Sequence, residues 1–326
     1  MVNITSSRGL DFSDVLIEPC LSDVNSRAEV DLITHFQDWS GIPILASNMH
    51  NVGTFEVAKV FSEYKMPTFL HKDYTLEDYK TNDYDPEYVG ISGGLNSFEY
   101  IKRILTYNPE IRFICLDVAN GYIKNFHKLV AEISHYVSQL KQIKILVAGN
   151  VVTKDGVKTL REQGADIIKV GLGSGNLCDT RLKTGIGIPQ FTAVVNCVEY
   201  STWDGSSIMS DGGCRNPGDI VKAFAAGAEF VMLGSMLAGH DETSQVMYGM
   251  SSEHAMTLNG VFHDYRTSEG RKVEDIEYKG PLVNTVRDIL GGIRSACTYT
   301  DCYSLSKFIQ KQHRFIEVHN QVSHTI

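Results

Sequence analysis

The sequence has little of what marks linkers and membrane proteins. Proline supplies only 8 of 326 residues, and no Pro/Ser-rich or low-complexity stretch divides the chain. The most apolar stretch, residues 223–239, is broken by Glu229 and by small or polar residues. It falls short of the roughly 18 uninterrupted apolar residues that a membrane span requires. We therefore expect one domain over residues 1–326, no transmembrane helix and no membrane partner.

Clustered positive charge is also missing. Lys and Arg number 30 against 39 Asp and Glu, which gives a net charge of −9, and the basic residues are scattered. Because a nucleic-acid partner requires a clustered basic face, we expect none. The seven cysteines are an odd number without a C-x-x-C pair, and no basic and apolar leader follows Met1. These features favour a reduced, cytoplasmic protein.

What the sequence does contain is a regular alternation of short apolar runs and helical patterns. The runs have strand length and cover residues 43–46, 68–70, 89–91, 113–116, 145–148, 167–170, 207–210 and 230–233. Helical patterns cover residues 55–64, 76–79, 96–106, 122–140, 154–163, 190–200 and 217–225. Continuous apolar character indicates strands buried on both faces, as in a parallel sheet covered by helices.

Eight such units predict an α/β protein with a (β/α)8 TIM barrel, preceded by an N-terminal extension. The weakly periodic segment 239–280 is interpreted as active-site loops, and a closing helix is expected from residue 285 onward. Periodicity alone leaves a doubly wound sheet open as the alternative.

In a barrel, reactive groups lie on the loops that follow the strands. The sixth strand leads into a glycine-rich loop and then Cys178, with Thr180 and Arg181 close by. This setting suits an activated thiolate, although most free cysteines are simply buried. We interpret residues 178–181 as not opening a helix, so that Gly171-Leu172-Gly173 is not a dinucleotide-binding loop.

Glycine-bearing loops also follow the seventh and eighth strands, where barrels often hold phosphate. Asp211 in the first of these loops suits ribose hydroxyls better than phosphate, and both loops could instead be simple tight turns. Glu269 is a candidate proton relay or a solvated loop acid. His240, His254 and His263 lack a metal-ligand spacing, so we expect no zinc site among them.

Ordered motifs along nearly the whole chain resemble the IMP dehydrogenase and GMP reductase family. The matching segments are residues 10–16, 26–30, 48–49, 52–56, 71–72, 115–121, 148–153, 178–190, 211–214, 248–252 and 290–295. Dehydrogenases of this family usually carry inserted regulatory CBS modules, and no gap between the predicted strands has room for them. The sequence therefore resembles the reductase branch, without a CBS insertion.

The resemblance implies an oxidoreductase of purine metabolism and nucleotide salvage that converts GMP to IMP with NADPH and releases ammonia. Cys178 would form a thioimidate with the purine, and Thr180 and Glu269 would relay the proton to the departing amine. It also implies a homotetramer and a monovalent cation, usually K+. Two other functions stay open: IMP dehydrogenation with NAD, and purine-nucleotide binding without catalysis.

The resemblance also implies binding residues. Those for the nucleotide are Asp211, Gly212, Gly213, Gly234, Ser235, Gly249, Met250, Ser251, Arg266, Thr267, Ser268 and Gly270. Those for NADPH, partly from a neighbouring subunit, are Ser26, Arg27, Lys72, Asp117, Val118, Ala119, Val170, Gly171, Met250, Tyr265, Arg266, Ser295, Ala296, Cys297 and Thr298. Those for K+ are Gly171, Gly173, Cys178 and Arg181.

Four positions depart from the family pattern. His50 replaces an Asp, Asn176 a Ser, Asp179 a Thr and Ser235 a Gly. Asn176 can still donate from its amide. Asp179 would disfavour a thiolate if it pointed toward Cys178, and would have little effect if it pointed to solvent.

Overall fold

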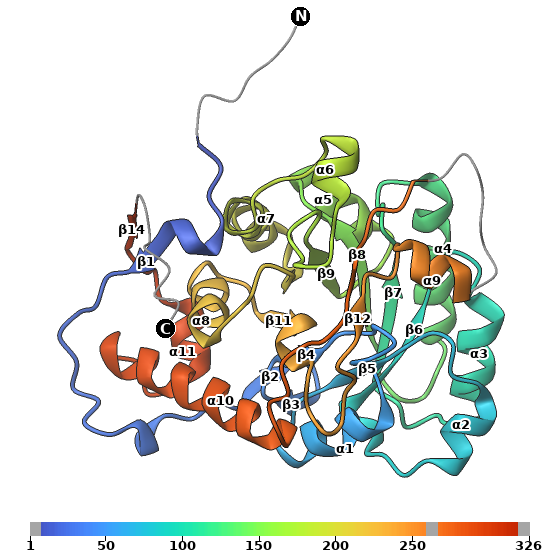
Figure 1. Cartoon of the computed structure of the whole chain (residues 1–326), viewed down its shortest axis with the longest axis horizontal. Coiled ribbons are helices and arrows are strands. Elements are labelled where there is room, and N and C mark those ends of the chain that lie inside the picture. Colours follow the sequence, from blue (N-terminus) through green and yellow to red (C-terminus); the bar gives the residue numbers. More distant parts are fainter. Residues whose placement is uncertain (1–7, 259–266, 319–326) are drawn as a thin grey trace, which may run out of the picture.

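A closed barrel of eight parallel strands forms the centre of the molecule (Figure 1). The computed structural model describes residues 8–258 and 267–318. In barrel order the strands are β4 (Ile44–Ala46), β5 (Thr68–Leu70), β6 (Val89–Gly93), β7 (Phe113–Asp117), β8 (Ile145–Val151), β9 (Ile167–Val170), β10 (Ser207–Asp211) and β11 (Phe230–Leu233). All eight predicted runs are barrel strands, because β11 pairs back onto β4 and closes the sheet. The closure confirms the (β/α)8 barrel and excludes the doubly wound alternative.

Helices lie between the strands and cover the barrel. They are α1 (Phe55–Glu63), α2 (Leu76–Thr81), α3 (Phe98–Tyr107), α4 (Lys124–Val137), α5 (Lys154–Glu162), α6 (Thr180–Thr184), α7 (Gln190–Asp204) and α8 (Pro217–Ala225). Side-chain caps fix where several of them begin. The side chain of Thr153 accepts from the Gly156 amide, and that of Asn216 accepts from the Asp219 amide before Pro217 in the first turn.

Helix α6 corrects one sequence prediction. Residues 178–181 were expected not to open a helix, yet α6 begins directly after Asp179. With five residues the helix is too short to show a 3.6-residue period, and the Asp179 side chain makes no cap hydrogen bond. The remaining signal was Gly185, which ends the helix in the left-handed conformation at φ 71°.

The segment after β11 is more ordered than loops alone. It contains the 3-10 helix η4 (Ser235–Leu237), the antiparallel pair β12 (Met247–Tyr248) and β13 (Lys272–Val273), and the helix α9 (Glu253–Leu258). Beyond it, α10 (Leu282–Tyr299) and α11 (Leu305–Gln310) occupy the region in which a closing helix was expected.

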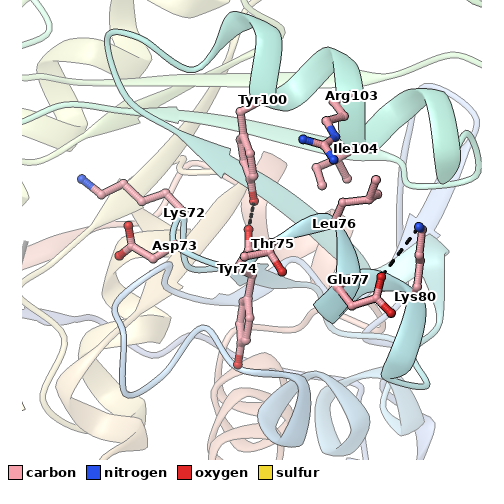
Figure 2. A pocket seen from close by; sticks show the side chains of 10 residues that line it. All are labelled: Lys72, Asp73, Tyr74, Thr75, Leu76, Glu77, Lys80, Tyr100, Arg103 and Ile104. Atoms are coloured by element: carbon pink, nitrogen blue, oxygen red, sulfur yellow. Dashed lines mark hydrogen bonds and ion pairs between the residues drawn. The ribbon is translucent and has the colours of Figure 1, made fainter.

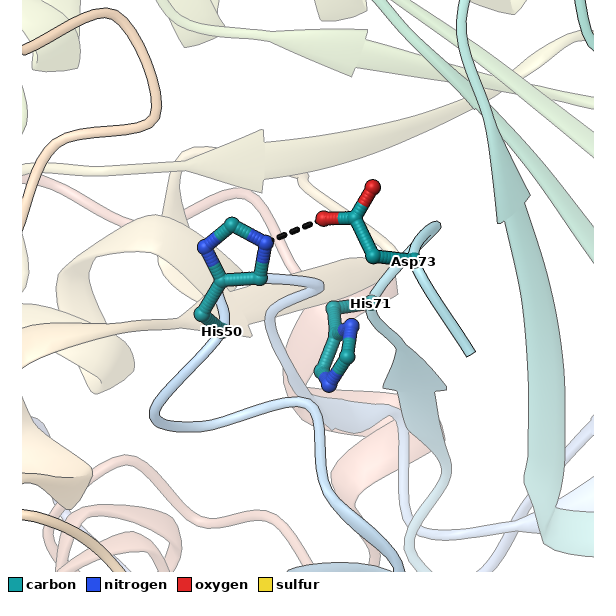
Figure 3. Close-up of side chains that lie close together, drawn as sticks. All are labelled: His50, His71 and Asp73. Atoms are coloured by element: carbon teal, nitrogen blue, oxygen red, sulfur yellow. Dashed lines mark hydrogen bonds and ion pairs between the residues drawn. The ribbon is translucent and has the colours of Figure 1, made fainter. Parts of the chain in front are cut away.

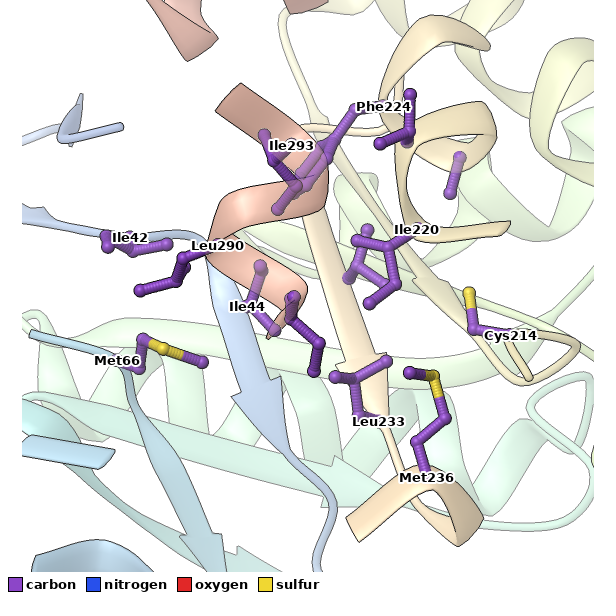
Figure 4. Packing of buried hydrophobic residues seen from close by; sticks show 14 of the residues in the cluster. Ile42, Ile44, Met66, Cys214, Ile220, Phe224, Leu233, Met236, Leu290 and Ile293 are labelled. Carbon is purple, nitrogen blue, oxygen red and sulfur yellow. The ribbon is translucent and has the colours of Figure 1, made fainter. Parts of the chain in front are cut away.

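Apolar side chains from α8 and α10 pack over β4 and β11 (Figure 4). Ile220 and Phe224 of α8 meet Leu290 and Ile293 of α10 above Ile44 in this cluster, and four of these five side chains are almost fully buried, Leu290 being 7% exposed. This packing fixes α10 against the outside of the barrel.

An aromatic cluster fills the barrel at the amino ends of its strands. The hairpin of β2 (Thr34–Phe36) and β3 (Trp39–Gly41) inserts Trp39 against Phe113 at a ring-centroid distance of 5.4 Å, and against Phe230 at 6.1 Å. Trp39 is 1% exposed. Because side chains fill the barrel at the amino ends of its strands, a functional site is expected at the carboxyl ends.

The two ends of the described chain meet. Strand β1 (Val15–Ile17), which follows η1 (Phe12–Asp14), pairs antiparallel with β14 (Phe315–Glu317). The short helices η2 (Arg27–Glu29) and η3 (Pro86–Tyr88) complete the elements. Within residues 8–258 and 267–318, none of the helices combines the length and apolar character needed to cross a membrane.

Candidate functional site

The Cys178 loop, which follows β9, is stitched by backbone hydrogen bonds to two segments far along the chain. The Asp179 amide donates to the Glu269 carbonyl at 2.8 Å, and the Arg271 amide to the Leu177 carbonyl at 3.0 Å. On the other side of segment 269–271, the Gly249 amide donates to the Arg271 carbonyl at 3.0 Å. A Cβ on Gly249 would lie 2.9 Å from the Leu177 carbonyl oxygen, so this close approach requires glycine.

These backbone hydrogen bonds bring three functional groups into a continuous line. The Cys178 Sγ lies 3.1 Å from the Thr180 Oγ1, and that hydroxyl donates to the Glu269 Oε2 at 2.9 Å. Thr180 is the buried first residue of α6, whereas Cys178 is partly exposed. The structure thus brings together a thiol, a hydroxyl and a carboxylate in an order that can pass a proton.

Loops after β9, β10 and β11 converge beside Cys178. The Ser174 hydroxyl donates to the Asp211 carbonyl at 3.4 Å, and the Asn176 amide donates to the Ser235 hydroxyl at 3.0 Å. Gly212 and Gly213 have φ values of 95° and 83°, which side chains other than glycine rarely adopt. The predicted nucleotide loops therefore share one face of the barrel with the thiol.

Beneath these loops, a buried lysine joins two predicted binding residues. The Lys169 Nζ, with a side chain 1% exposed, lies 3.2 Å from the Asp117 Oδ2 and 3.0 Å from the Asp211 Oδ2. Burial alone would lower the pKa of Lys169, but the two carboxylates outweigh it and raise the pKa. Asn150 also donates to the Asp211 Oδ2, at 2.8 Å. Lys169 and Asn150 both contact the Oδ2 of Asp211, so within the described part of the chain its Oδ1 stays available as an acceptor.

Lys72, one of the predicted NADPH residues, borders a cavity of about 450 Å³ that reaches over α2 and α3 (Figure 2). Lys80 and Arg103 add two more cationic side chains to its lining, and Tyr74 and Tyr100 add aromatic rings. The Tyr100 hydroxyl donates to the Tyr74 carbonyl at 2.8 Å, which ties the two walls together. The carboxylates of Asp73 and Glu77 also line the cavity, and Glu77 pairs with Lys80 at 3.7 Å, so the lining carries charges of both signs. Its cationic groups and aromatic rings could still contact an anionic, ring-bearing ligand.

The other predicted NADPH residues lie in several places. Asp117, Val118 and Ala119 end and follow β7, while Val170 and Gly171 end and follow β9. Ser26 caps η2, Ser295 to Thr298 belong to α10, and η2 packs against α10. Cys297 is fully buried in the core beneath α10. Tyr265 and Arg266 lie outside the described residues.

The predicted cation loop curls around Arg181. Its guanidinium donates to the Ile188 carbonyl at 2.6 Å and pairs with Asp11 at 3.3 Å. A Cβ on Gly173, whose φ is 76°, would lie 2.5 Å from the Arg181 Cγ. The Gly171 carbonyl already accepts from Asn150 at 2.9 Å. Backbone oxygens of this loop can act as hard ligands, whereas the guanidinium has no lone pair to offer.

A family model described as "IMP dehydrogenase / GMP reductase domain" matches residues 87–324. The chain belongs to the IMP dehydrogenase / GMP reductase family. Curated relatives include "GMP reductase 2" of Homo sapiens, 44% identical over 347 residues, covering 99% of this chain and 98% of the relative. They also include "GMP reductase 1" of Mus musculus, 44% identical with 98% of each chain covered. "GMP reductase" of Klebsiella pneumoniae is 44% identical, with 96% and 95% covered.

Three of the four departures from the family pattern have partners in the structure that account for them locally. The Asp179 carboxylate is held by Arg271, with its Oδ1 2.7 Å from Nη2 and 3.1 Å from Nε, so its charge is compensated. Asn176 and Ser235 are hydrogen-bonded to each other, as described above. The sequence analysis left open whether Asp179 would disfavour a thiolate at Cys178. In the structure, Arg271 from the segment that carries Glu269 provides a counter-ion for Asp179.

The fourth departure, His50, takes part in a cluster with His71 and Asp73 (Figure 3). The His50 Nε2 is hydrogen-bonded to the Asp73 carboxylate, and the Tyr248 hydroxyl lies 3.2 Å from the His50 Nδ1. Burial first, and then His50, lower the pKa of His71 to about 4, so its ring is neutral near pH 7. The expected absence of a zinc site concerned three other histidines, His240, His254 and His263. Of these, His240 forms hydrogen bonds with the Leu237 carbonyl and the Thr285 hydroxyl.

Two features of this site were missed from the sequence, and only the first of them left a signal. Lys169 is a single charge inside the apolar strand β9, which is typical of a buried ion pair. Arg271 follows directly on the segment that carries Glu269, but nothing in the sequence relates it to Asp179, 92 residues away.

Proposed function

We propose that the chain catalyses the NADPH-dependent reductive deamination of GMP to IMP with release of ammonia. The observation that carries this proposal is the line from the Cys178 thiol through the Thr180 hydroxyl to the Glu269 carboxylate, with distances of 3.1 and 2.9 Å. Relatives named GMP reductase, 44% identical over nearly the whole chain, support GMP as the substrate.

The line of hydrogen bonds offers a route for one proton. With Glu269 ionised, Thr180 donates to it and accepts from the thiol of Cys178, so a proton can leave the sulfur and reach the carboxylate. The resulting thiolate adds to C2 of the purine. The stored proton then returns through Thr180 to the departing amino group, which leaves as ammonia and gives a thioimidate on Cys178.

The second half of the reaction removes the thioimidate. When bound, NADPH supplies a hydride to C2, and the C–S bond breaks to return the thiolate of Cys178. The sulfur must therefore act both as a nucleophile and as a leaving group. Its partial exposure leaves it open to a substrate, and the Thr180 hydroxyl lies beside it to take up its proton. Lys72, which borders the cavity, would bind the anionic part of the cofactor, and the other predicted cofactor residues would complete the pocket.

Nucleotide binding is assigned to the three converging loops. Backbone amides of Gly212, Gly213 and Gly234 would hold the phosphate, with Asn176 and Ser235 closing over it. The free Oδ1 of Asp211 would accept from the ribose hydroxyls, since Lys169 fixes Oδ2. The residues that complete the predicted set are Gly249, Met250, Ser251, Arg266, Thr267, Ser268 and Gly270.

Two further assignments belong to the same proposal. Backbone oxygens of Gly171, Gly173 and Cys178, and of Arg181 rather than its guanidinium, would hold a monovalent cation. A homotetramer would let Ser26, Arg27 and the α10 residues serve the cofactor site of a neighbouring subunit. Its mass in solution, four times that of the chain, is measurable by light scattering.

The deciding experiment follows the loss of NADPH absorbance with purified protein, GMP and K+. We expect loss that depends on GMP and is matched by ammonia, and that disappears in Cys178→Ala but persists in Cys20→Ala, which removes an exposed thiol outside the site. Full turnover by Cys178→Ala would overturn the proposal. Nicotinamide reduction with IMP and NAD alone would identify a dehydrogenase, and GMP binding without turnover a non-catalytic protein.

A further inference from the structure

His50, His71 and Asp73 form a compact group of side chains that can ligate a metal, just beyond the carboxyl ends of β4 and β5 (Figure 3). Each residue offers one ligand atom, and the three atoms lie within 4.8 Å of one another. The His50 and His71 rings are 5.0 Å apart between centroids. Two imidazoles and one carboxylate are a ligand set that divalent transition metals prefer, because nitrogen and oxygen donors of this kind suit Zn2+, Co2+ and Fe2+.

The backbone that carries the three residues is well supported. His50 follows β4, while His71 and Asp73 follow the neighbouring strand β5, so both loops start from adjacent barrel strands. The His71 amide donates to the Gly53 carbonyl at 3.0 Å, which ties the two loops together. The His71 ring is stacked on Tyr74 at 3.9 Å between centroids. These contacts hold the two loops in place relative to each other, as a defined site requires.

Two details of the side chains favour metal binding over a simple contact between His50 and Asp73. Among the described residues, the buried Nδ1 of His71 has no hydrogen-bond partner. The Tyr248 hydroxyl already engages the His50 Nδ1 at 3.2 Å, which leaves Nε2 directed at Asp73. Ligating histidines commonly have such a second partner on the other ring nitrogen, because it fixes the ring orientation.

We propose that His50, His71 and Asp73 bind one divalent transition-metal ion, with water completing its coordination. Metal–ligand bonds of about 2.0–2.2 Å place tetrahedral ligands roughly 3.3–3.5 Å apart. The His50 Nε2 and the Asp73 Oδ2, which contact each other, would therefore separate by about 1 Å to admit an ion, while the His71 nitrogen would approach them. Asp73, whose side chain is 41% exposed, leaves the site open to solvent and lets the ion enter. The site does not depend on the proposed reaction.

The test is a titration of the full-length protein with Co2+, followed by its visible spectrum and by equilibrium dialysis. We expect one Co2+ per chain, with the weak bands of nitrogen and oxygen ligands. His50→Leu and Asp73→Asn should each weaken binding at least about tenfold. The matched control is His135→Ala, which removes an exposed histidine on α4 and should leave binding unchanged.

Three results would overturn the proposal: no Co2+ bound to the native chain, equal binding by both ligand variants, or intense sulfur-to-cobalt charge-transfer bands that place the ion on a cysteine. Thermal unfolding with and without Co2+ supplies a second readout. At one fixed Co2+ concentration, the ion should raise the unfolding temperature of the native chain and of His135→Ala by more than that of Asp73→Asn, whose exposed position makes misfolding a poor explanation.

Discussion

Asp179 and Arg271 form a salt bridge one residue away from the Cys178 thiol, with the Asp179 Oδ1 2.7 Å from the Arg271 Nη2. The bridge keeps a carboxylate next to the thiol without leaving its charge uncompensated. Removing Arg271 would restore that negative charge, and a negative charge disfavours a nearby thiolate. We expect Arg271→Ala to slow alkylation of Cys178 by about threefold to tenfold, the effect of one partly screened charge at short range.

The rate is measurable with iodoacetamide in a Cys20→Ser background, because the other thiols do not compete. Cys115, Cys197, Cys214, Cys297 and Cys302 are buried, and burial raises the pKa of Cys197 and Cys297 to about 12. The double variant Arg271→Ala/Asp179→Asn removes the carboxylate charge as well and should recover the native rate. If the double variant stays as slow as the single one, Arg271 acts on the loop geometry instead.

The Thr180 hydroxyl is the middle member of the proposed relay, so its removal should interrupt proton transfer. Thr180→Val keeps the shape of the side chain and removes the hydroxyl, and we expect kcat to fall by about 100-fold or more. Thr180→Ser retains the hydroxyl and should keep most of the activity. Steady-state rates with GMP decide between them, and equal losses in both variants would show that packing around buried Thr180 matters and not its proton.

Glu269 is expected to store the proton in the same relay. Glu269→Gln retains a hydrogen-bond acceptor for Thr180 but takes up no proton, so kcat should fall while GMP binding, measured by calorimetry, changes little. A large loss of GMP affinity with unchanged kcat would instead make Glu269 a binding residue.

Sequence patterns predicted the barrel because each barrel strand is a short apolar run that can be recognised from its own residues. Run 167–170, for example, is β9 with the same bounds, and Pro217 with the preceding Asn216 located the start of α8. The short helix α6 escaped prediction because five residues contain too little periodicity. Local sequence therefore determines the elements well when they are long or capped.

The site was predictable only in part, for a related reason. Cys178 and Thr180 stand close together in the sequence, but Glu269 joins them through backbone pairing of segments 177–179 and 269–271, which no local pattern reveals. Glu269 was a candidate proton relay from its place in a polar loop, and the resemblance to a family supplied its link to Cys178 and Thr180. The resemblance did not supply the pairs Asp179–Arg271 and Asn176–Ser235, since these depend on the particular residues of this chain.

Lys169 should contribute to stability as well as to positioning Asp211. Replacing it by Met leaves the carboxylates of Asp117 and Asp211 close together without their shared counter-ion. Breaking a buried ion pair costs about 3–5 kcal/mol, and partial exposure of the two carboxylates reduces our expectation to about 2–3 kcal/mol. Urea unfolding measures the loss. Lys158→Met, on the exposed face of α5, is the matched control and should change stability by less than about 0.5 kcal/mol.

His240 should make the stability of the chain depend on pH. Burial lowers the pKa of His240, while its Nδ1 faces the Leu237 carbonyl at 3.0 Å and its Nε2 the Thr285 hydroxyl at 2.7 Å. In the unfolded chain a histidine titrates near about 6.5. Between that value and the lowered one, the unfolded chain binds a proton that the folded chain does not. The free energy of unfolding therefore falls as the pH drops below about 6.5, and this contribution is constant above it.

The variant His240→Gln isolates this contribution, because glutamine can keep polar contacts with Leu237 and Thr285 but does not titrate. Thermal unfolding at pH 7 and at pH 5 should show a smaller decrease for His240→Gln than for the native chain. Carboxylates also respond to acid, but they are common to both proteins and cancel in the difference. Equal decreases in the two proteins would mean that His240 binds its proton as readily when folded as when unfolded, against the direction that its burial requires.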